Sequence, residues 1–159
     1  MPQPVPEGYH TLSPYLAVED AKAAIEFYQR AFGAKERVRM DGPDGSIGHA
    51  ELEIGDSIVM LSDPFPQSTA RPPKELGGTS AGIFVYVDNV DDLYKQAIDA
   101  GATSAMEPEN MFWGDRFGSV TDPFGHSWQI ATHVEDVPPQ EMEERANKWM
   151  AEMAGAPTN

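Results

Sequence analysis

The chain has 159 residues, of which 40% are hydrophobic and 23% charged, and its formal net charge is −15. This length suits one well-buried core, or two small modules that share one, and excludes two independent domains. The acidic surface repels phosphate groups, and no apolar run approaches the roughly 20 residues that span a bilayer, so we expect neither nucleic-acid nor membrane binding. The chain has no cysteine, which is typical of a reducing cytoplasm, and we expect a cytoplasmic protein.

The first half of the chain is predicted to form one strand, one helix and three further strands. Alternation predicts a strand over residues 12–18, and apolar spacings of three and four predict a helix over 21–32, between the cap Asp20 and Gly33. Two turn sequences, DGPDGS and Gly55-Asp56, divide the next stretch into strands. These strands are expected at 35–40, 48–54 and 57–62.

The same order returns after a proline-rich connector at 63–80. A strand is predicted over 83–87, a helix over 88–100 that ends at Gly101, and strands near 103–107, 117–121 and 127–132. A last helix is predicted over 139–153. Its apolar residues form one stripe that we expect to dock on the domain itself or on a second copy: Met142, Ala146, Trp149, Met150 and Met153.

A constant offset of 69 residues relates the two halves. It places Tyr15 on Phe84 and Met60 on Gln129, and self-similarity at such a period indicates a duplicated module. We therefore predict an α+β fold with two tandem βαβββ modules, residues 9–62 and 80–133, that form a curved sheet cleft. They constitute a single domain, 1–133, followed by a helical tail, 134–159.

In each module the helix covers one face of the sheet, and alternation directs every second side chain to the other, concave face. Aromatic groups with a few polar ones gather there, as is usual for a ligand pocket, although they would also fill the space between two sheets. Arg116 either anchors a substrate carboxylate at this site or pairs with Asp115 or Asp122. The other predicted lining residues are Tyr15, His49, Glu51, Met60, Phe84, Tyr86, Phe112, Trp113 and Gln129.

The chain resembles the vicinal-oxygen-chelate superfamily, which includes glyoxalase I, the extradiol dioxygenases and the bleomycin-resistance proteins. The resemblance covers residues 9–133. It is most specific in SPYLAVEDAKAAIEFYQRAFGA, HAELEIGDSIVMLSD and FWGDRFGSVTDPFGHSWQIATH. It implies paired βαβββ modules around a cleft and chains that dimerise. The expected partners are therefore a small-molecule ligand and a second copy of this chain, a homodimer.

Enzymes of that superfamily bind a divalent metal through four positions, which alignment by strand and turn places at Ser13, Met60, Gly82 and Gln129. None of these residues is His, Asp or Glu, the ligands that such metals need. The resemblance therefore predicts a metal-free branch, and we expect no cofactor. His49 and Glu51, two apart on one strand, form an alternative pair of ligands. His10 and His133 are interpreted as surface or edge histidines.

Docking of the C-terminal stripe is favoured over a third, interaction-only role in which it recruits a foreign partner, so two functions are carried forward. The first is a small-molecule-binding protein of the glyoxalase/bleomycin-resistance type, with an apolar or planar ligand in an aromatic cleft. The acidic surface favours a cationic ligand, and the resemblance implies a role in antibiotic resistance. The alternative is an atypical lyase-, isomerase- or dioxygenase-like enzyme. Its general base would be Glu51, with a pKa raised by the aromatic cleft and tuned by His49.

Overall fold

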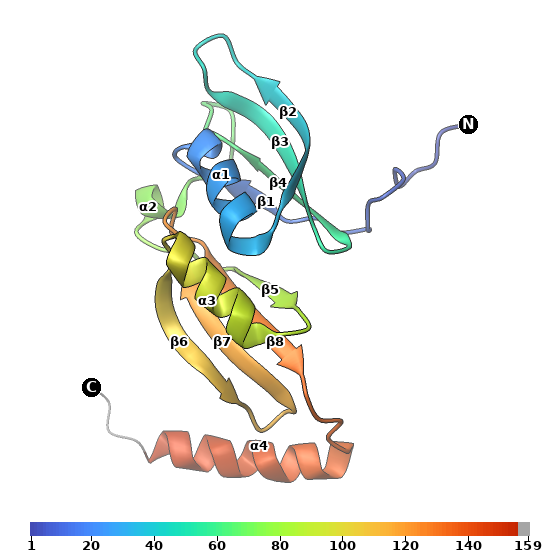
Figure 1. Cartoon of the computed structure of the whole chain (residues 1–159), viewed down its shortest axis with the longest axis vertical. Helices are drawn as coiled ribbons and strands as arrows, with labels where there is room; N and C mark the ends of the chain where they lie inside the picture. Colours follow the sequence, from blue (N-terminus) through green and yellow to red (C-terminus); the bar gives the residue numbers. More distant parts are fainter. Residues whose placement is uncertain (156–159) are drawn as a thin grey trace.

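The computed structural model describes residues 1–155 and confirms an α+β fold in which one plan occurs twice (Figure 1). The first module contains β1 (Tyr15–Ala17), α1 (Ala21–Phe32), β2 (Lys35–Asp41), β3 (Ile47–Ile54) and β4 (Ser57–Ser62). The second contains β5 (Gly82–Tyr86), α3 (Val90–Ala100), β6 (Thr103–Asn110), β7 (Asp115–Thr121) and β8 (Ser127–His133). The short helix α2 (Pro73–Leu76) lies in the connector, and α4 (Pro139–Ala154) follows β8. Residues 156–159 of the expected tail lie outside the described residues.

Each module forms a four-stranded sheet in which the first and last strands pair in parallel. The strand orders are β1-β4-β3-β2 and β5-β8-β7-β6. Tyr15 pairs with Met60 in the first sheet and Phe84 with Gln129 in the second, so the registers follow the predicted offset.

The two long helices of the modules also begin in the same way. As predicted, Asp20 caps α1: its side chain accepts a hydrogen bond from the backbone amide three residues further on, at 3.0 Å. Asn89 caps α3 in the same way, at 3.1 Å. The side chain of Asp63, which follows β4, accepts a hydrogen bond from the first backbone amide of α1 at 2.9 Å. The side chain of Thr132, near the end of β8, accepts one from the first backbone amide of α3 at 2.8 Å. Each helix start is therefore fixed to its own sheet.

The expected and observed strands differ mainly at β1 and β7. The strand predicted over 12–18 contains only Tyr15–Ala17, because Pro14 has no amide hydrogen to continue the ladder, although its carbonyl accepts from Met60 N at 2.9 Å. β7 begins at Asp115, two residues earlier than predicted. This earlier start brings Asp115 and Arg116 into the strand, where alternation sends their side chains to opposite faces.

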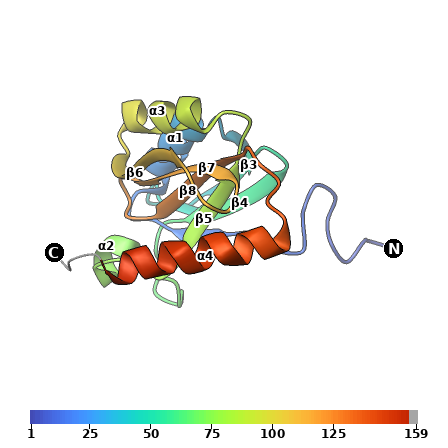
Figure 2. The same ribbon diagram turned by 90° about the horizontal axis from the view of Figure 1, so that it is seen from below.

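Helices α1 and α3 lie side by side on one side of both sheets (Figures 1 and 2). One cluster of buried apolar side chains continues through them from the first module to the second. Phe32 of α1 stacks on Trp128 of β8 with ring centroids 4.2 Å apart. Tyr28 of α1 donates a hydrogen bond to Asp122 of the second module at 2.6 Å. The modules therefore share one core.

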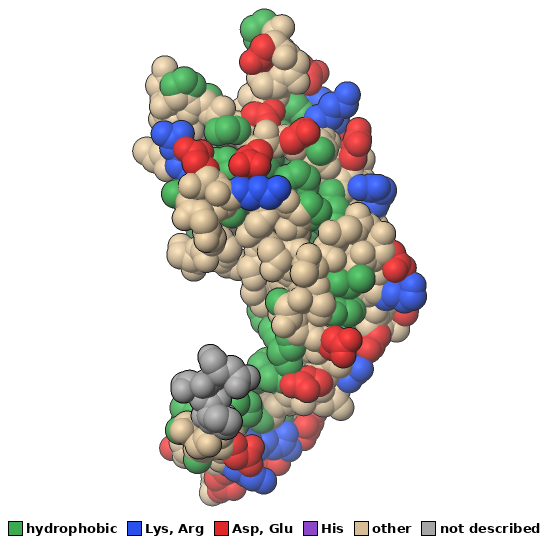
Figure 3. All heavy atoms as spheres, turned by 90° about the vertical axis from the view of Figure 1, so that its left-hand side faces the viewer, with side chains coloured by type: hydrophobic (Ala, Val, Ile, Leu, Met, Phe, Trp, Pro, Cys, Tyr) green, Lys and Arg blue, Asp and Glu red, His purple; other side chains and the backbone are tan. Residues whose placement is uncertain are grey.

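The sheet faces turned away from α1 and α3 are not covered by a helix layer. In profile the molecule is bent, and its hollow side faces away from these helices (Figure 3). Helix α4 lies on this side of the sheets, at the far end of the second module (Figure 2). Within residues 1–155, no helix combines the length and the apolar character needed to cross a bilayer.

Candidate functional site

The open face of the first sheet carries a row of predicted site residues. Tyr15, Met60 and Glu51 lie next to one another across β1, β4 and β3. His49 lies two residues before Glu51 on β3, while the intervening Ala50 is fully buried in the core. Strand alternation thus separates the polar side chains from those that contact α1.

Hydrogen bonds connect these polar side chains into one chain. The Tyr15 hydroxyl contacts His49 Nδ1 at 3.1 Å, and His49 Nε2 contacts Glu51 Oε1 at 3.0 Å. Tyr9, from the arm that precedes β1, donates to Glu51 Oε2. The guanidinium of Arg37 lies 5.3 Å above the Tyr9 ring, within the range of a cation–π contact. The N-terminal arm is therefore held against this face.

The carboxylate of Glu51 is almost fully buried, with 8% of the residue exposed. Burial raises its pKa, but the hydrogen bonds from Tyr9 and His49 outweigh burial and leave the pKa below its ordinary value. The expectation of a raised pKa is therefore wrong. The physical reason is Tyr9, whose position could not be derived from the strand pattern.

The open face of the second sheet is aromatic and continues into α4. Ring centroids are 5.0 Å apart for Phe84 and Tyr86, 5.7 Å for Phe84 and Phe117, and 5.7 Å for Phe117 and Trp113. Such separations suit favourable aromatic pairs. The ring centroid of Phe112 lies 5.2 Å from that of Trp113 and 5.6 Å from that of Trp149 on α4. We call the following residues the aromatic face: Phe84, Tyr86, Phe112, Trp113 and Phe117.

A buried carboxylate supports the aromatic face. Asp115 is 2% exposed and accepts hydrogen bonds from Tyr86 Oη, Trp113 Nε1 and His133 Nδ1, each at 2.9 Å. Burial raises the pKa of Asp115, yet these bonds, first that of His133, leave it lowered. His133 Nε2 contacts Asp136 at 2.8 Å, and its two carboxylate partners, first Asp136, raise the pKa of His133.

Several residues of these networks were not predicted as site residues, namely Tyr9, Arg37, Asp115, Phe117, His133 and Asp136. The signal for Asp115 is alternation, because a strand that starts at residue 115 places Asp115 and Phe117 on one face. His133 was interpreted as a surface or edge histidine, but it bridges two carboxylates. Tyr9 lies in an arm without periodicity, so no pattern indicated its contact with Glu51.

Arg116 does not lie on the open face, and the expectation that it lines the cleft is wrong. It points to the helix side of β7, where Nε and Nη2 donate to the two carboxylate oxygens of Asp91 on α3 at 2.6 and 2.7 Å. It pairs with neither Asp115 nor Asp122, the partners considered above. The physical reason is again strand parity, since neighbours on a strand face opposite sides.

The four positions that correspond to the superfamily's metal ligands do not fit a divalent cation. The amide of Gln129 donates to Ser127 Oγ at 2.8 Å and covers Gly82 so closely that a Cβ at this glycine would collide with its Oε1. Ser13 and Met60 offer a hydroxyl and a thioether, which are poor ligands for such ions. Among residues 1–155, no cluster of three or more His, Asp or Glu side chains could hold a metal.

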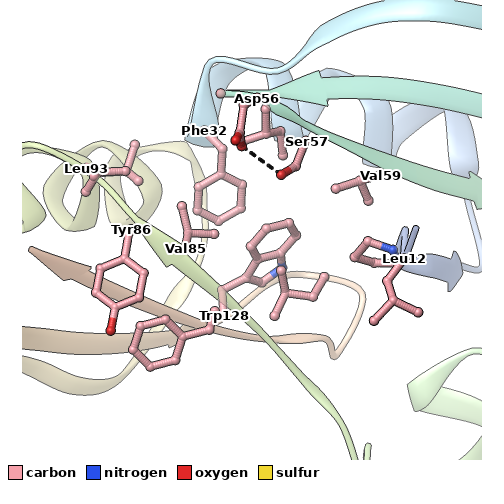
Figure 4. A pocket seen from close by; sticks show the side chains of 15 residues that line it. Leu12, Phe32, Asp56, Ser57, Val59, Val85, Tyr86, Leu93 and Trp128 are labelled. Carbon is pink, nitrogen blue, oxygen red and sulfur yellow. Dashed lines mark hydrogen bonds between the residues drawn. The ribbon is translucent and has the colours of Figure 1, made fainter. Parts of the chain in front are cut away.

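Two cavities lie where the modules meet. One, of about 400 Å³, brings Tyr15 of β1 and Phe84 of β5 to the same wall. The other, of about 420 Å³, borders β5 and has Asp56 and Ser57 at one side of a mostly apolar lining (Figure 4). Phe84 and Tyr86 are the only predicted site residues that line it. Its other labelled apolar residues are Leu12, Phe32, Val59, Val85, Leu93 and Trp128.

Comparison with known proteins places this fold in a family. The sequence profile of the Glyoxalase/Bleomycin resistance protein/Dioxygenase superfamily matches residues 9–130. An uncharacterized protein of Mycobacterium tuberculosis is 46% identical over 129 residues, covering 79% of this chain and 76% of that protein. TioX from Micromonospora sp. ML1 superposes with a TM-score of 0.63 and 27% identity, over 79% of this chain and 99% of TioX. A gene product of Arabidopsis thaliana superposes with a TM-score of 0.62 and 26% identity, over 77% of this chain and 98% of that protein. The chain belongs to the Glyoxalase/Bleomycin resistance protein/Dioxygenase superfamily.

Proposed function

We propose that this protein binds a planar or apolar small molecule, with a cationic one preferred, on the aromatic face. The observation that carries the proposal is the exposure of Phe84 and Tyr86, 47% and 62%, on a strand face that has no helix to cover it. Burial of one such aromatic contact contributes about 1.5–3 kcal/mol. A ligand that touches two or three rings is therefore bound without any ion pair.

The charge of the site supports the preference for cations. Glu51 remains ionised because its pKa is lowered, and the whole chain carries a net charge of −15. An acidic protein concentrates cations in its clefts. By resemblance to the bleomycin-resistance proteins, such binding would sequester a drug and confer resistance. The cysteine-free composition supports a cytoplasmic location for this role.

The test is a fluorescence titration with ethidium, a planar cation, and with Nile red, a planar neutral dye. We expect saturable binding to the wild-type protein and about tenfold weaker binding to Phe84→Ala, as loss of the ring contact requires. Phe65→Ala is the matched control, because Phe65 lies in the connector and is 43% exposed. Absence of saturable binding, or equal loss in both variants, would contradict the proposal.

We also propose that binding requires no metal. The Gln129 amide over Gly82 and the ligand-poor residues Ser13 and Met60 support this. Elemental analysis of purified protein and calorimetric titration with zinc, nickel and manganese should give no stoichiometric metal. Dye affinity should be unchanged by a chelator. One bound metal per chain would contradict this part of the proposal.

An enzyme that uses Glu51 and His49 is the second candidate. The His49–Glu51 contact of 3.0 Å and the flanking tyrosines favour it. However, the lowered pKa of Glu51 makes it a weaker base than expected. Glu51→Gln should abolish turnover of any substrate that the protein accepts, whereas unchanged turnover would exclude Glu51 as the base.

A further inference from the structure

The strongest feature without an assigned role is the carboxylate behind the aromatic face. Asp115 is buried, and two of its three hydrogen-bond donors, Tyr86 and Trp113, belong to the aromatic face itself. The third donor, His133, is half exposed and also contacts Asp136. One carboxylate thus orients two rings and is connected to a histidine, a side chain that can gain or lose a proton.

We propose that Asp115 makes the aromatic face selective for cations, and that the proton on His133 sets the strength of this selectivity. The inference rests on the proposed function and specifies which residues determine the charge of the preferred ligand. Asp115 is a positioning residue, because it acts through Tyr86 and Trp113 rather than by contact with the ligand.

The hydrogen bonds to Asp115 change the two rings that donate them. A hydroxyl that donates to a carboxylate carries more electron density into its ring, and the face of an electron-rich ring attracts cations. Tyr86 and Trp113 both donate to Asp115 Oδ2 at 2.9 Å. Because Asp115 is withdrawn from water, its charge is weakly screened at the rings in front of it.

The charge of the cluster formed by Asp115, His133 and Asp136 depends on the proton of His133. With His133 protonated, Asp115, His133 and Asp136 together carry one negative charge. After loss of the proton they carry two. The other charged groups near His133 are Asp88, which lines a shallow hollow with it, and Glu135, which is paired with Arg145 of α4 at 2.7 Å. The guanidinium of Arg145 is already paired with Glu135 and Glu141, so its charge does not replace the lost proton.

The direction of the pH dependence follows from this count. The two carboxylates raise the pKa of His133, so the proton is retained above the ordinary value of 6.5. A cationic ligand should therefore bind more tightly as the pH rises through the pKa of His133. A neutral planar ligand should be affected little. By linkage, a bound cation should in turn lower the pKa of His133.

The experiment measures the dissociation constants of ethidium and Nile red at pH 6 and pH 9. For the wild-type protein we expect ethidium to bind about three- to tenfold more tightly at pH 9, the effect of one charge at this range, and Nile red to change less than twofold. His133→Gln should remove the pH dependence for ethidium. His10→Gln, which changes an exposed histidine near Asp56 in the first module, should retain it.

Asp115→Asn supplies the second arm. It should weaken ethidium binding at pH 9 by a larger factor than Nile red binding, whereas a merely structural loss would weaken both equally. Binding of neither dye at any pH would overturn the proposed function and this inference with it. Binding of ethidium with a pH dependence that survives in His133→Gln, or disappears in His10→Gln, would overturn this inference alone.

Discussion

At the scale of single residues, the molecule places its buried carboxylates where several donors converge. Asp122 accepts bonds from Tyr28 Oη and Trp128 Nε1, and also from two backbone amides of its own turn. Asp115 and Glu51 accept from side chains on the open faces. A buried charge is stable only when it is hydrogen-bonded. The hydrogen bonds of Asp122 hold the two modules together, whereas those of Asp115 and Glu51 shape the site.

Tyr28→Phe tests the hydrogen bond between Tyr28 and Asp122 that connects the modules. Burial and the neighbouring Asp122 hold the pKa of the Tyr28 hydroxyl well above its ordinary value, so it stays a donor. Its removal leaves Asp122 with one donor fewer, and we expect the free energy of unfolding to fall by about 1–3 kcal/mol. Urea denaturation measures this change. Tyr94→Phe, which removes an exposed bond to Ser104, should cost less than about 0.5 kcal/mol; equal losses would refute the role of Asp122.

Glu51→Gln tests the sign of a pKa shift. The folded protein lowers the pKa of Glu51 below 4.5, so its carboxylate contributes stability that is complete above the ordinary pKa and is lost as the pH falls through the folded pKa. The unfolding free energy of the wild type should therefore fall more steeply between pH 5 and pH 3 than that of Glu51→Gln. Glu26→Gln on the exposed side of α1 is the charge-matched control and should follow the wild-type slope.

At the scale of elements, local signals predicted most boundaries, and tertiary contacts decided the rest. Helix α1 occupies the predicted residues because the Asp20 side chain caps its first turn and Gly33, in the left-handed conformation, ends its last turn. Alternation predicted the open-face position of Phe84 and Tyr86, where the structure has them. It was not applied to Arg116, because the predicted strand began at residue 117 and left Arg116 in the preceding loop. The arm with Tyr9 has no repeat of apolar residues, so its contact with Glu51 depends on the folded chain alone.

Helix α4 is a docked element although it buries no residue completely. Arg145 donates to the carbonyl of Phe112 at 3.2 Å and to Glu135, and Trp149 packs on the Phe112 ring. The connector before α4 passes directly over Gly114, whose carbonyl accepts two of its amides. The tail therefore forms one end wall of the hollow side.

Gly114→Ala should detach this wall. Gly114 has φ +98°, and a Cβ there would collide with the carbonyl oxygen of Glu135. We expect faster tryptic cleavage after Arg145 and Lys148 and a changed Trp149 fluorescence. Gly45→Ala is the control, because Gly45 has φ +81° with no atom within 4 Å of the added methyl. It should show the strain of about 1–2 kcal/mol without faster cleavage; identical behaviour of both variants would contradict tail docking.

At the scale of the whole molecule, large apolar side chains remain exposed on the open faces and on α4. Monomers rarely expose contiguous apolar patches of more than a few hundred Å², so we infer that a second copy covers part of this surface. The residues concerned are Met40, Trp149, Met150 and Met153, which lie outside the proposed ligand-binding rings.

Light scattering after gel filtration tests this inference. The wild type should have twice the 17.4 kDa mass of the chain. Met150→Glu, at a residue of α4 that is 53% exposed, should shift the mass toward the monomer, because it places a charge in an apolar contact. Leu76→Glu on α2, where Leu76 is also exposed, should remain dimeric. A wild-type monomer at tens of micromolar would contradict the homodimer.

The shared core leads to the last prediction, that the two modules unfold as one cooperative unit. Phe32 stacks on Trp128 across the modules, and Tyr28 reaches Asp122, so opening of either module exposes apolar surface of the other. In urea, far-UV circular dichroism and tryptophan fluorescence should give coincident transitions. Hydrogen exchange of the slowest amides in β3 and in β8 should report the same free energy. Phe32→Ala, in the first module, should then accelerate exchange in β8 as much as in β3. Faster exchange confined to the first module would show that the modules are independent and that the Phe32–Trp128 contact is only a surface of association.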